Sequence, residues 1–142
     1  MKKFFYFVAL MSSLAVVIPN AQAARVTHLV FADGAIHAHC TWVKGPLESP
    51  EESFLRVDWK SGVDHTAIEP PGAFKVALFM PDMGHGTAPT QIQRILDDQG
   101  RAVLGAYQVS NIFFTMKGDW LVNVTLKSPD GKEETKAFKV HL

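Results

Sequence analysis

The sequence predicts an all-β fold, an antiparallel β-sandwich or a small barrel, and three observations support that class. Helical periodicity is almost absent after the first 23 residues. Short apolar stretches with period-two alternation recur instead, at intervals of about ten to fifteen residues. Clusters of Gly, Pro, Asp and Ser separate these stretches, as turns separate the strands of sandwiches and barrels.

The N-terminal segment, residues 1–23, has the three parts of an export signal. Lys2 and Lys3 supply the positive start, Phe4–Ile18 is an apolar core, and Ala21–Ala23 is a small-x-small cleavage site. An uncleaved membrane anchor is the alternative, but roughly 15 apolar residues fall short of the ~20 that span a bilayer. The pattern therefore predicts cleavage, export to the periplasm and no membrane span in the mature chain.

The remaining residues, 24–142, are expected to form a single domain. Removing 23 of 142 residues leaves 119, which is the size of one ordinary domain with one core. Lys2 and Lys3 leave with the signal, so 12 basic residues remain against 14 acidic ones, a formal charge of −2. This balance gives no reason to expect nucleic acid or an anionic membrane as a partner. Cys40 is the single cysteine, which excludes an intrachain disulfide.

The first half of this domain is expected to contain two clear strands separated by a loop. Residues 53–60 alternate apolar and polar side chains, with Leu55, Val57 and Trp59 on one face, as a half-buried strand does. Residues 61–73 are polar and contain Pro-Pro-Gly, which predicts an irregular loop. Residues 74–80 are almost continuously apolar and predict a central strand covered on both faces.

The second half is expected to end in a hairpin. Residues 89–100 favour a strand that runs into an Asp-Asp-Gln-Gly turn, with a short helix as the alternative, and residues 105–120 add one further strand. The stretch that begins at Trp120 then alternates strictly, and the Pro and Asp-Gly turn residues of 128–134 lead into a returning strand over 136–142.

Two clusters hold most of the candidate metal ligands. The first is the loop of Met80, Met83 and His85, and the second is the His-Ala-His-Cys run of His37, His39 and Cys40. Thioether and thiolate sulfur mixed with imidazole suits Cu(I) better than a hard cation. Zinc would be served by cysteine and histidine but gains little from methionine. The donor types therefore favour copper.

Simple geometry limits both clusters. On an extended strand His37 and His39 share one face, whereas Cys40 points to the other and would join them only through a bulge or turn. Met80 ends an apolar strand, a position that favours a core residue over a ligand, and Cys40 is expected to be a buried small hydrophobic residue rather than a thiolate. The remaining histidines of the mature chain, His28, His65 and His141, are expected to be surface residues.

The sequence contains no motif that predicts an enzyme. It has no Gly-x-Ser-x-Gly elbow, no His-Glu-x-x-His helix, no Cys-x-x-Cys pair and no phosphate-binding glycine loop. A hydrolase that uses Cys40 with a histidine is the remaining enzymatic reading, and it lacks the motif context of such enzymes. We therefore expect a binding protein.

Three consecutive motifs resemble a known family. They are Met-Pro-Asp-Met-Gly-His-Gly at 80–86, Gly-Ala-Tyr at 105–107 and Phe-Thr-Met-Lys-Gly-Asp-Trp at 114–120. In this combination the chain resembles the YtkA-like domain family, which is related to the FixH group of small exported or membrane-tethered bacterial proteins. The similarity covers about residues 74–126, and residues 24–53 match no pattern of the family.

The resemblance implies an immunoglobulin-like β-sandwich, copper binding, and copper-handling or oxidase-assembly proteins of the cell envelope as partners. Together with the residue-level analysis, it predicts a periplasmic copper-binding protein whose ligands are Met80, Met83 and His85, with His37, His39 and Cys40 as additions. The alternative is a non-metal interaction module of the envelope in which the loop at 80–86 is structural.

Overall fold

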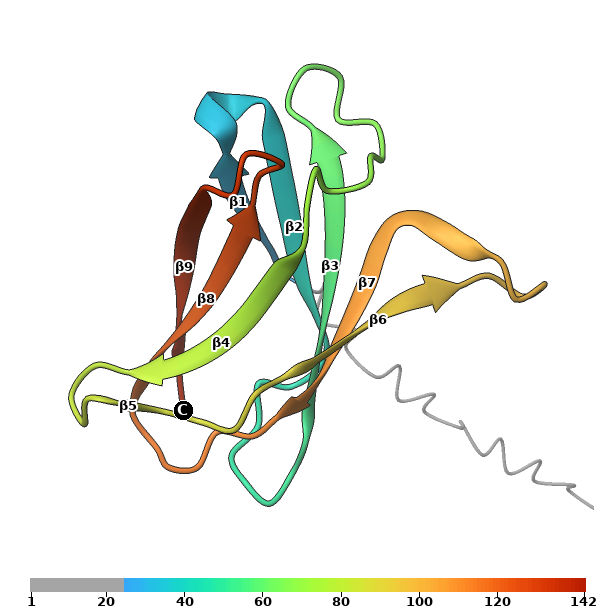
Figure 1. Ribbon diagram of the computed structural model, residues 1–142. Helices are drawn as coiled ribbons and strands as arrows, with labels where there is room; N and C mark the ends of the chain where they lie inside the picture. The colour runs from blue at the N-terminus through green and yellow to red at the C-terminus, as the bar shows by residue number, and fades with distance from the viewer. Residues whose placement is uncertain (1–24) are drawn as a thin grey trace, which may run out of the picture.

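The computed structural model describes residues 25–142, which form two antiparallel β-sheets packed face to face (Figure 1). The predicted signal peptide, residues 1–23, lies outside the described residues. The five-stranded sheet contains, in spatial order, β1 (Val26–Phe31), β2 (Ile36–Lys44), β3 (Ser53–Ser61), β7 (Ala102–Ile112) and β6 (Gln91–Leu96). The four-stranded sheet contains β5 (His85–Gly86), β4 (Phe74–Met80), β8 (Asp119–Lys127) and β9 (Glu133–His141). A single 3-10 turn, η1 (Ala32–Gly34), joins β1 to β2.

The strand order is that of an immunoglobulin-like sandwich. Strands β2, β3, β7 and β6 occupy the positions of A, B, E and D in one sheet, and β4, β8 and β9 those of C, F and G in the other. The short β5 adds a C′ strand beside β4, and β1 adds a strand outside β2. The predicted all-β antiparallel sandwich is therefore confirmed.

Alternating side chains determine which face of each strand is buried. In β3, Leu55, Val57 and Trp59 are buried, and the polar residues between them face outward. In β8, Trp120 and Val122 are fully buried, and the strand pairs with β9 as the C-terminal hairpin predicted from the turn residues. Residues 91–96 form a strand, so the helical alternative for this stretch is wrong.

The apolar run of residues 74–80 behaves differently from the prediction. It forms β4, but only Val76, Leu78 and Met80 are buried, whereas Lys75, Ala77 and Phe79 are exposed. One neighbour of β4 is the full-length β8 and the other is β5, which has two residues. The strand is thus half-buried and lies near the open edge of its sheet, so the prediction of a strand covered on both faces is wrong.

The two sheets enclose one hydrophobic core. Its largest fully buried side chains are Trp59, Trp120, Phe31, Phe114, Leu55 and Ile112. The loop between β3 and β4, residues 62–73, is irregular as predicted. Among the described residues, no helix has the length and apolarity needed to cross a membrane.

Candidate metal centre

Strand β2 directs two histidines to the outer face of the five-stranded sheet. Ala38 and Cys40 are buried on the inner face, so His37 and His39, which alternate with them, point outward and are half-buried. The predicted shared face of the two histidines is therefore confirmed, as is the opposite orientation of Cys40. The backbone of β2 fixes the distance between the His37 and His39 side chains, so the pair is a rigid part of a candidate metal site.

His65 reaches the same place from the loop after β3. Its ring centroid is 5.2 Å from that of His37 and 6.3 Å from that of His39. The nitrogen atoms that could bind metal on His37, His39 and His65 all lie within 4.8 Å of one another. Three nitrogens on one ion, at ~2.0–2.1 Å each, lie about 3 to 4 Å apart. Small side-chain rotations would therefore bring the three imidazoles, here named the histidine cluster, onto a common ion.

The backbone of the loop holds His65 in position. The residue has a φ of 56°, a left-handed conformation that histidine adopts more readily than most residues. Its N–H donates to the carbonyl of Ser61 at 3.0 Å, and the N–H of Gly62 donates to the carbonyl of Ala35 at 2.8 Å. A Cβ at position 62 would lie 1.7 Å from the carbonyl oxygen of Gly34, so only glycine permits this close approach.

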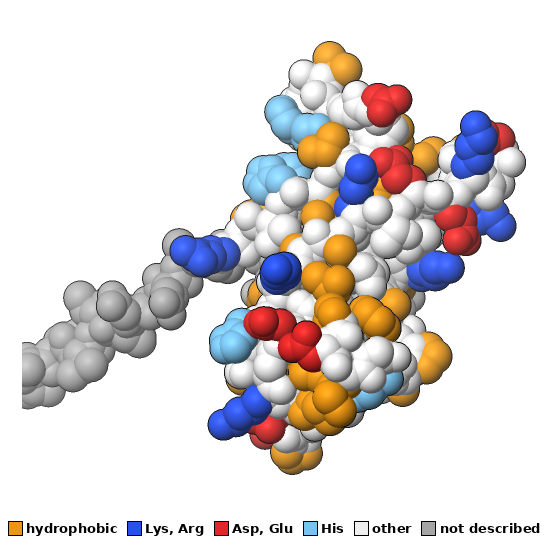
Figure 2. All heavy atoms as spheres, turned by 90° about the vertical axis from the view of Figure 1, so that its left-hand side faces the viewer, with side chains coloured by type: hydrophobic (Ala, Val, Ile, Leu, Met, Phe, Trp, Pro, Cys, Tyr) orange, Lys and Arg blue, Asp and Glu red, His pale blue; other side chains and the backbone are white. Residues whose placement is uncertain are grey.

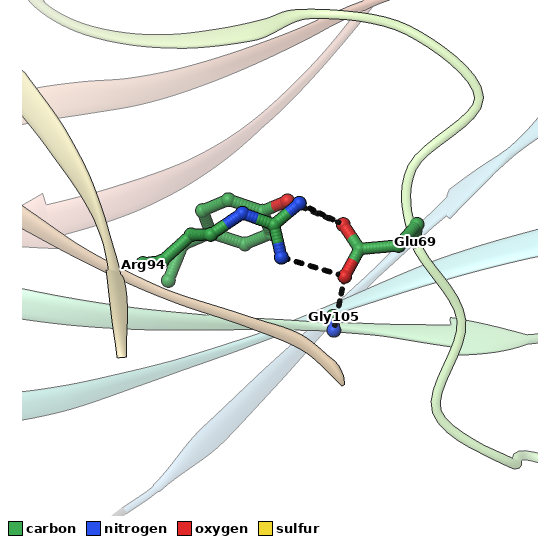
Figure 3. A network of polar contacts seen from close by, with 4 residues as sticks. Glu69, Arg94 and Gly105 are labelled. Atoms are coloured by element: carbon green, nitrogen blue, oxygen red, sulfur yellow. Dashed lines mark hydrogen bonds and ion pairs between the residues drawn. The ribbon is translucent and has the colours of Figure 1, made fainter. Parts of the chain in front are cut away.

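A second set of contacts fastens the far end of the same loop to the sheet. Both carboxylate oxygens of Glu69 accept hydrogen bonds from the guanidinium of Arg94, at 2.9 Å each. Glu69 also accepts from the hydroxyl of Tyr107 at 2.6 Å and from the N–H of Gly105 at 3.2 Å. The bidentate ion pair and the Gly105 bond are drawn in Figure 3. These bonds lower the pKa of Glu69 to about 2, with Arg94 and then Tyr107 the main causes.

His28 covers one side of the cluster. It lies on β1 directly across from His39, and the two rings are 4.1 Å apart at an interplanar angle of 36°. Figure 2 shows histidine side chains together near the upper end of the molecule, beside hydrophobic side chains. The ring of His28 thus limits the freedom of His39.

His39 is the most constrained member of the cluster. Its pKa is lowered, first by burial and then by the nearby His28, Lys60, His37 and His65. Its Nε2 atom is buried and has no hydrogen-bond partner in the part of the chain that the structure describes. An unpaired buried nitrogen is unfavourable, and a neutral imidazole with a free nitrogen is the form that binds metal. Both properties fit a metal ligand.

The charged residues around the cluster are largely paired with other groups. Asp58, the cross-strand neighbour of His39, binds Arg56 through both carboxylate oxygens at 2.7 and 2.8 Å. Asp64, next to His65, accepts two hydrogen bonds from Thr66. Among the described residues, the side chains whose possible ligand atoms lie within 4.8 Å of one another are His37, His39 and His65, with no carboxylate in the group, so the donors of the candidate site are imidazole nitrogens.

Cys40 does not lie with the histidines. It is 2 % exposed and packs in the core, where burial and then the charge of Asp58 raise the pKa of its thiol to about 12. At neutral pH it is a protonated thiol, whereas metal binding requires the thiolate. Nothing in β2 supplies the bulge that would turn Cys40 to the outer face, because its register with β3 is regular from Ile36 to Trp42.

The loop of residues 80–86 lies elsewhere in the sandwich. Met80 is 3 % exposed in the core, Met83 is 58 % exposed, and His85 is half-buried with its Nδ1 3.2 Å from the carbonyl oxygen of Gly86. The N–H groups of Met83 and Gly84 both bind the carbonyl oxygen of Met80, which closes a tight turn. In Figure 1 this turn lies at the lower end of the sandwich, and the start of β2 and the 62–73 loop lie at the upper end.

Sequence reasoning missed two members of this arrangement. His65 and His28 are exposed, as expected of surface residues, yet they adjoin His37 and His39. For His28, a prediction that residues 26–31 form a strand paired with β2 could have placed it opposite His39. For His65 the signal was weaker, since only the fold of an irregular loop brings it back over the sheet.

Comparison of the chain with models of known protein families, with curated proteins and with solved structures finds no match. The resemblance to the YtkA-like domain family stays a prediction.

Proposed function

We propose that this protein is an exported copper-binding protein whose ion is held by the histidine cluster. The observation that carries the proposal is the approach of three metal-binding nitrogens, from His37, His39 and His65, to within 4.8 Å of one another. Imidazole is the commonest protein ligand of transition metals, and copper is bound most tightly in the divalent series. The free Nε2 of His39 supports the same assignment.

The histidine cluster is the main copper site in this function, and the loop of residues 80–86 is at most an accessory contact. The buried side chain of Met80 belongs to the core, and Cys40 is turned inward. Met83 and His85 can still form an accessory copper contact, because Met83 is exposed and His85 follows it by two residues. Export to the periplasm rests on the signal-like sequence of residues 1–23.

The protein acts in this proposal by binding and passing on copper, without catalysis. Its partners would be copper-handling or oxidase-assembly proteins of the cell envelope, as the family resemblance implies. A site on the outer face of a sheet with one exposed ligand, His65, suits exchange because an acceptor can approach the ion directly.

The test is the copper content of the purified chain after incubation with copper and gel filtration. We expect about one ion per chain in the wild type and a clear loss in a His37→Ala/His65→Ala variant, whose folding is verified by circular dichroism. A variant with Met83→Ala and His85→Ala is the matched control, because it removes the loop donors and keeps the cluster. Equal copper content in the wild type and the cluster variant would contradict the proposal.

A second candidate function is a non-metal interaction module, and one observation favours it. A groove of about 470 Å³ opens between β4 and the segment before β6, lined mainly by the apolar residues Phe74, Val76, Leu78, Ala88, Pro89 and Ile92. The edge of β4 beside it has β5 only at Phe79 and Met80. In this function the chain has no specific copper affinity, the loop of residues 80–86 is structural, and its mutation changes stability rather than metal content.

A further inference from the structure

Resting on the proposed function, we infer that the histidine cluster binds copper as Cu(II) and not as Cu(I). The three imidazole nitrogens fill three coordination positions of the ion and leave one open. The choice of oxidation state follows from which donors the fold brings together and which it keeps apart.

Sulfur is kept away from the cluster by the strand itself. Cys40 follows His39 directly in the sequence, but the alternation of β2 places its Sγ in the core and the imidazole outside. The 80–86 loop, between β4 and β5, lies toward the other end of the sandwich (Figure 1). Cu(I) is selected by thiolate and thioether ligands, whereas Cu(II) prefers nitrogen and oxygen. The donor set of the cluster therefore belongs to the higher oxidation state.

Hard cations are disfavoured by the same surroundings. Calcium and magnesium need several oxygen ligands. Asp58 is paired with Arg56 through both carboxylate oxygens, and neither Asp58 nor Asp64 belongs to the described group of possible ligands, which is His37, His39 and His65. The ligands offered to an ion at the histidine cluster are thus nitrogen atoms. Among the divalent first-row metal ions, Cu(II) binds such ligands most strongly.

The three ring centroids lie 5.2, 6.3 and 6.5 Å apart, and the nitrogen atoms lie within 4.8 Å of one another. Three imidazoles on a four-coordinate Cu(II) ion leave one position open. The exposed side of His65 leaves room for a water molecule or a donor atom of a partner to complete the ligand set.

The experiment compares Cu(II), Cu(I) and Zn(II) on the same folded chain. Each ion is titrated against a competing chelator, Cu(I) under anaerobic reducing conditions, and the Cu(II) form is examined by electron paramagnetic resonance. We expect one Cu(II) per chain, nitrogen hyperfine splitting from several imidazoles, weaker Zn(II) binding, and no Cu(I) binding that depends on the cluster.

His65→Ala is the first variant because His65 lies on an exposed loop, so the fold tolerates its loss. Removal of a residue that only supports a metal ligand lowers metal affinity by roughly 10- to 100-fold. Loss of the ligand His65 itself should lower the Cu(II) affinity by at least as much. His141→Ala is the matched control, since this exposed histidine binds Asp119 on the other sheet. It should leave the Cu(II) affinity unchanged.

The outcomes separate this inference from the proposed function. Tight Cu(I) binding that is lost in His65→Ala would overturn the oxidation-state assignment and leave the copper function in place. Zinc bound more tightly than Cu(II) would overturn the choice of metal. If neither copper ion binds in a way that depends on the cluster, the proposed function itself fails.

Discussion

His28 and His39 face each other across the β1–β2 pair, with their rings 4.1 Å apart. Two imidazoles this close cannot both be charged without repulsion. Lys60 and the other two histidines of the neighbourhood oppose the charging of His39 in the same direction. These neighbours and burial lower the pKa of His39 and so favour its neutral form, which matters for stability as well as for the proposed metal binding.

The first prediction concerns the metal-free protein in mild acid. The pKa of His39 is lowered by burial and by neighbouring charge, so the unfolded chain binds its proton more readily than the folded chain. Stability is therefore retained above the ordinary histidine pKa of about 6.5 and is lost as pH falls through the lower folded value. Urea unfolding between about pH 7.5 and about pH 5 measures this loss. His39→Gln should flatten the slope, and an unchanged slope would contradict the assignment.

The second prediction concerns Lys60, which pairs with His37 across β2 and β3. Its positive charge opposes a cation at the cluster, so Lys60→Gln should raise the Cu(II) affinity by about two- to threefold at low salt. Competition titration at two salt concentrations checks this, because the gain should shrink at high salt. Lys75→Gln, on β4 of the other sheet, is the control and should have no effect.

The third prediction concerns Glu69, which fastens the loop that carries His65. Glu69→Gln removes the bidentate bond to Arg94, and the added freedom of the loop should lower Cu(II) affinity by about 3- to 10-fold. Because the pKa of Glu69 is lowered to about 2, its bonds stabilise the fold above the ordinary glutamate value and are lost as pH falls toward about 2. The stability difference between wild type and variant should therefore vanish in strong acid; a difference that persists there would point to another cause.

The fourth prediction separates Cys40 from the site. Its thiol is buried, and its pKa is raised to about 12, so it should not react with iodoacetamide until the protein unfolds. Cys40→Ala should destabilise the fold by about 1 kcal/mol and leave Cu(II) affinity unchanged. Calorimetric titration of the variant measures the affinity, and a tenfold loss would place the sulfur on the metal.

The fifth prediction separates the two methionines of the 80–86 loop. Met80→Ala should destabilise the protein by about 2 to 4 kcal/mol, because the side chain is 3 % exposed in the core. Met83→Ala should change stability by less than about 0.5 kcal/mol, because the side chain is 58 % exposed. Denaturant unfolding of both variants gives the comparison, and equal effects would show that the loop is packed differently.

Much of the fold could be predicted from period-two patterns. Leu55, Val57 and Trp59 defined one buried face, and Trp120 and Val122 defined another, because burial of alternate side chains is a local property of a strand. The face of residues 74–80 could not be assigned this way, since Ala77 and Phe79 are apolar yet exposed. The burial of these residues depends on which strands pair with β4. Strand pairing is a long-range property, and the local sequence pattern of residues 74–80 does not determine it.

The candidate site was predictable only in part, for a related reason. His37 and His39 share a strand, so their common face followed from spacing alone. His28 and His65 join them through strand pairing and through a loop that folds back over Gly34, and neither contact is encoded in local spacing. The donors of the sulfur-rich loop are adjacent in sequence, whereas the histidine cluster takes its donors from two segments, β2 and the loop after β3.

The alternation of β2 has a consequence for the chemical durability of the protein. His39 and Cys40 are consecutive, yet the sheet stands between the imidazole and the thiol. Two Cu(II) ions that reach the thiolates of two chains oxidise them to an intermolecular disulfide, and each ion is reduced to Cu(I). By facing the core, Cys40 is shielded from an ion on the outer surface, so under the proposed function repeated copper loading and release would leave the thiol intact.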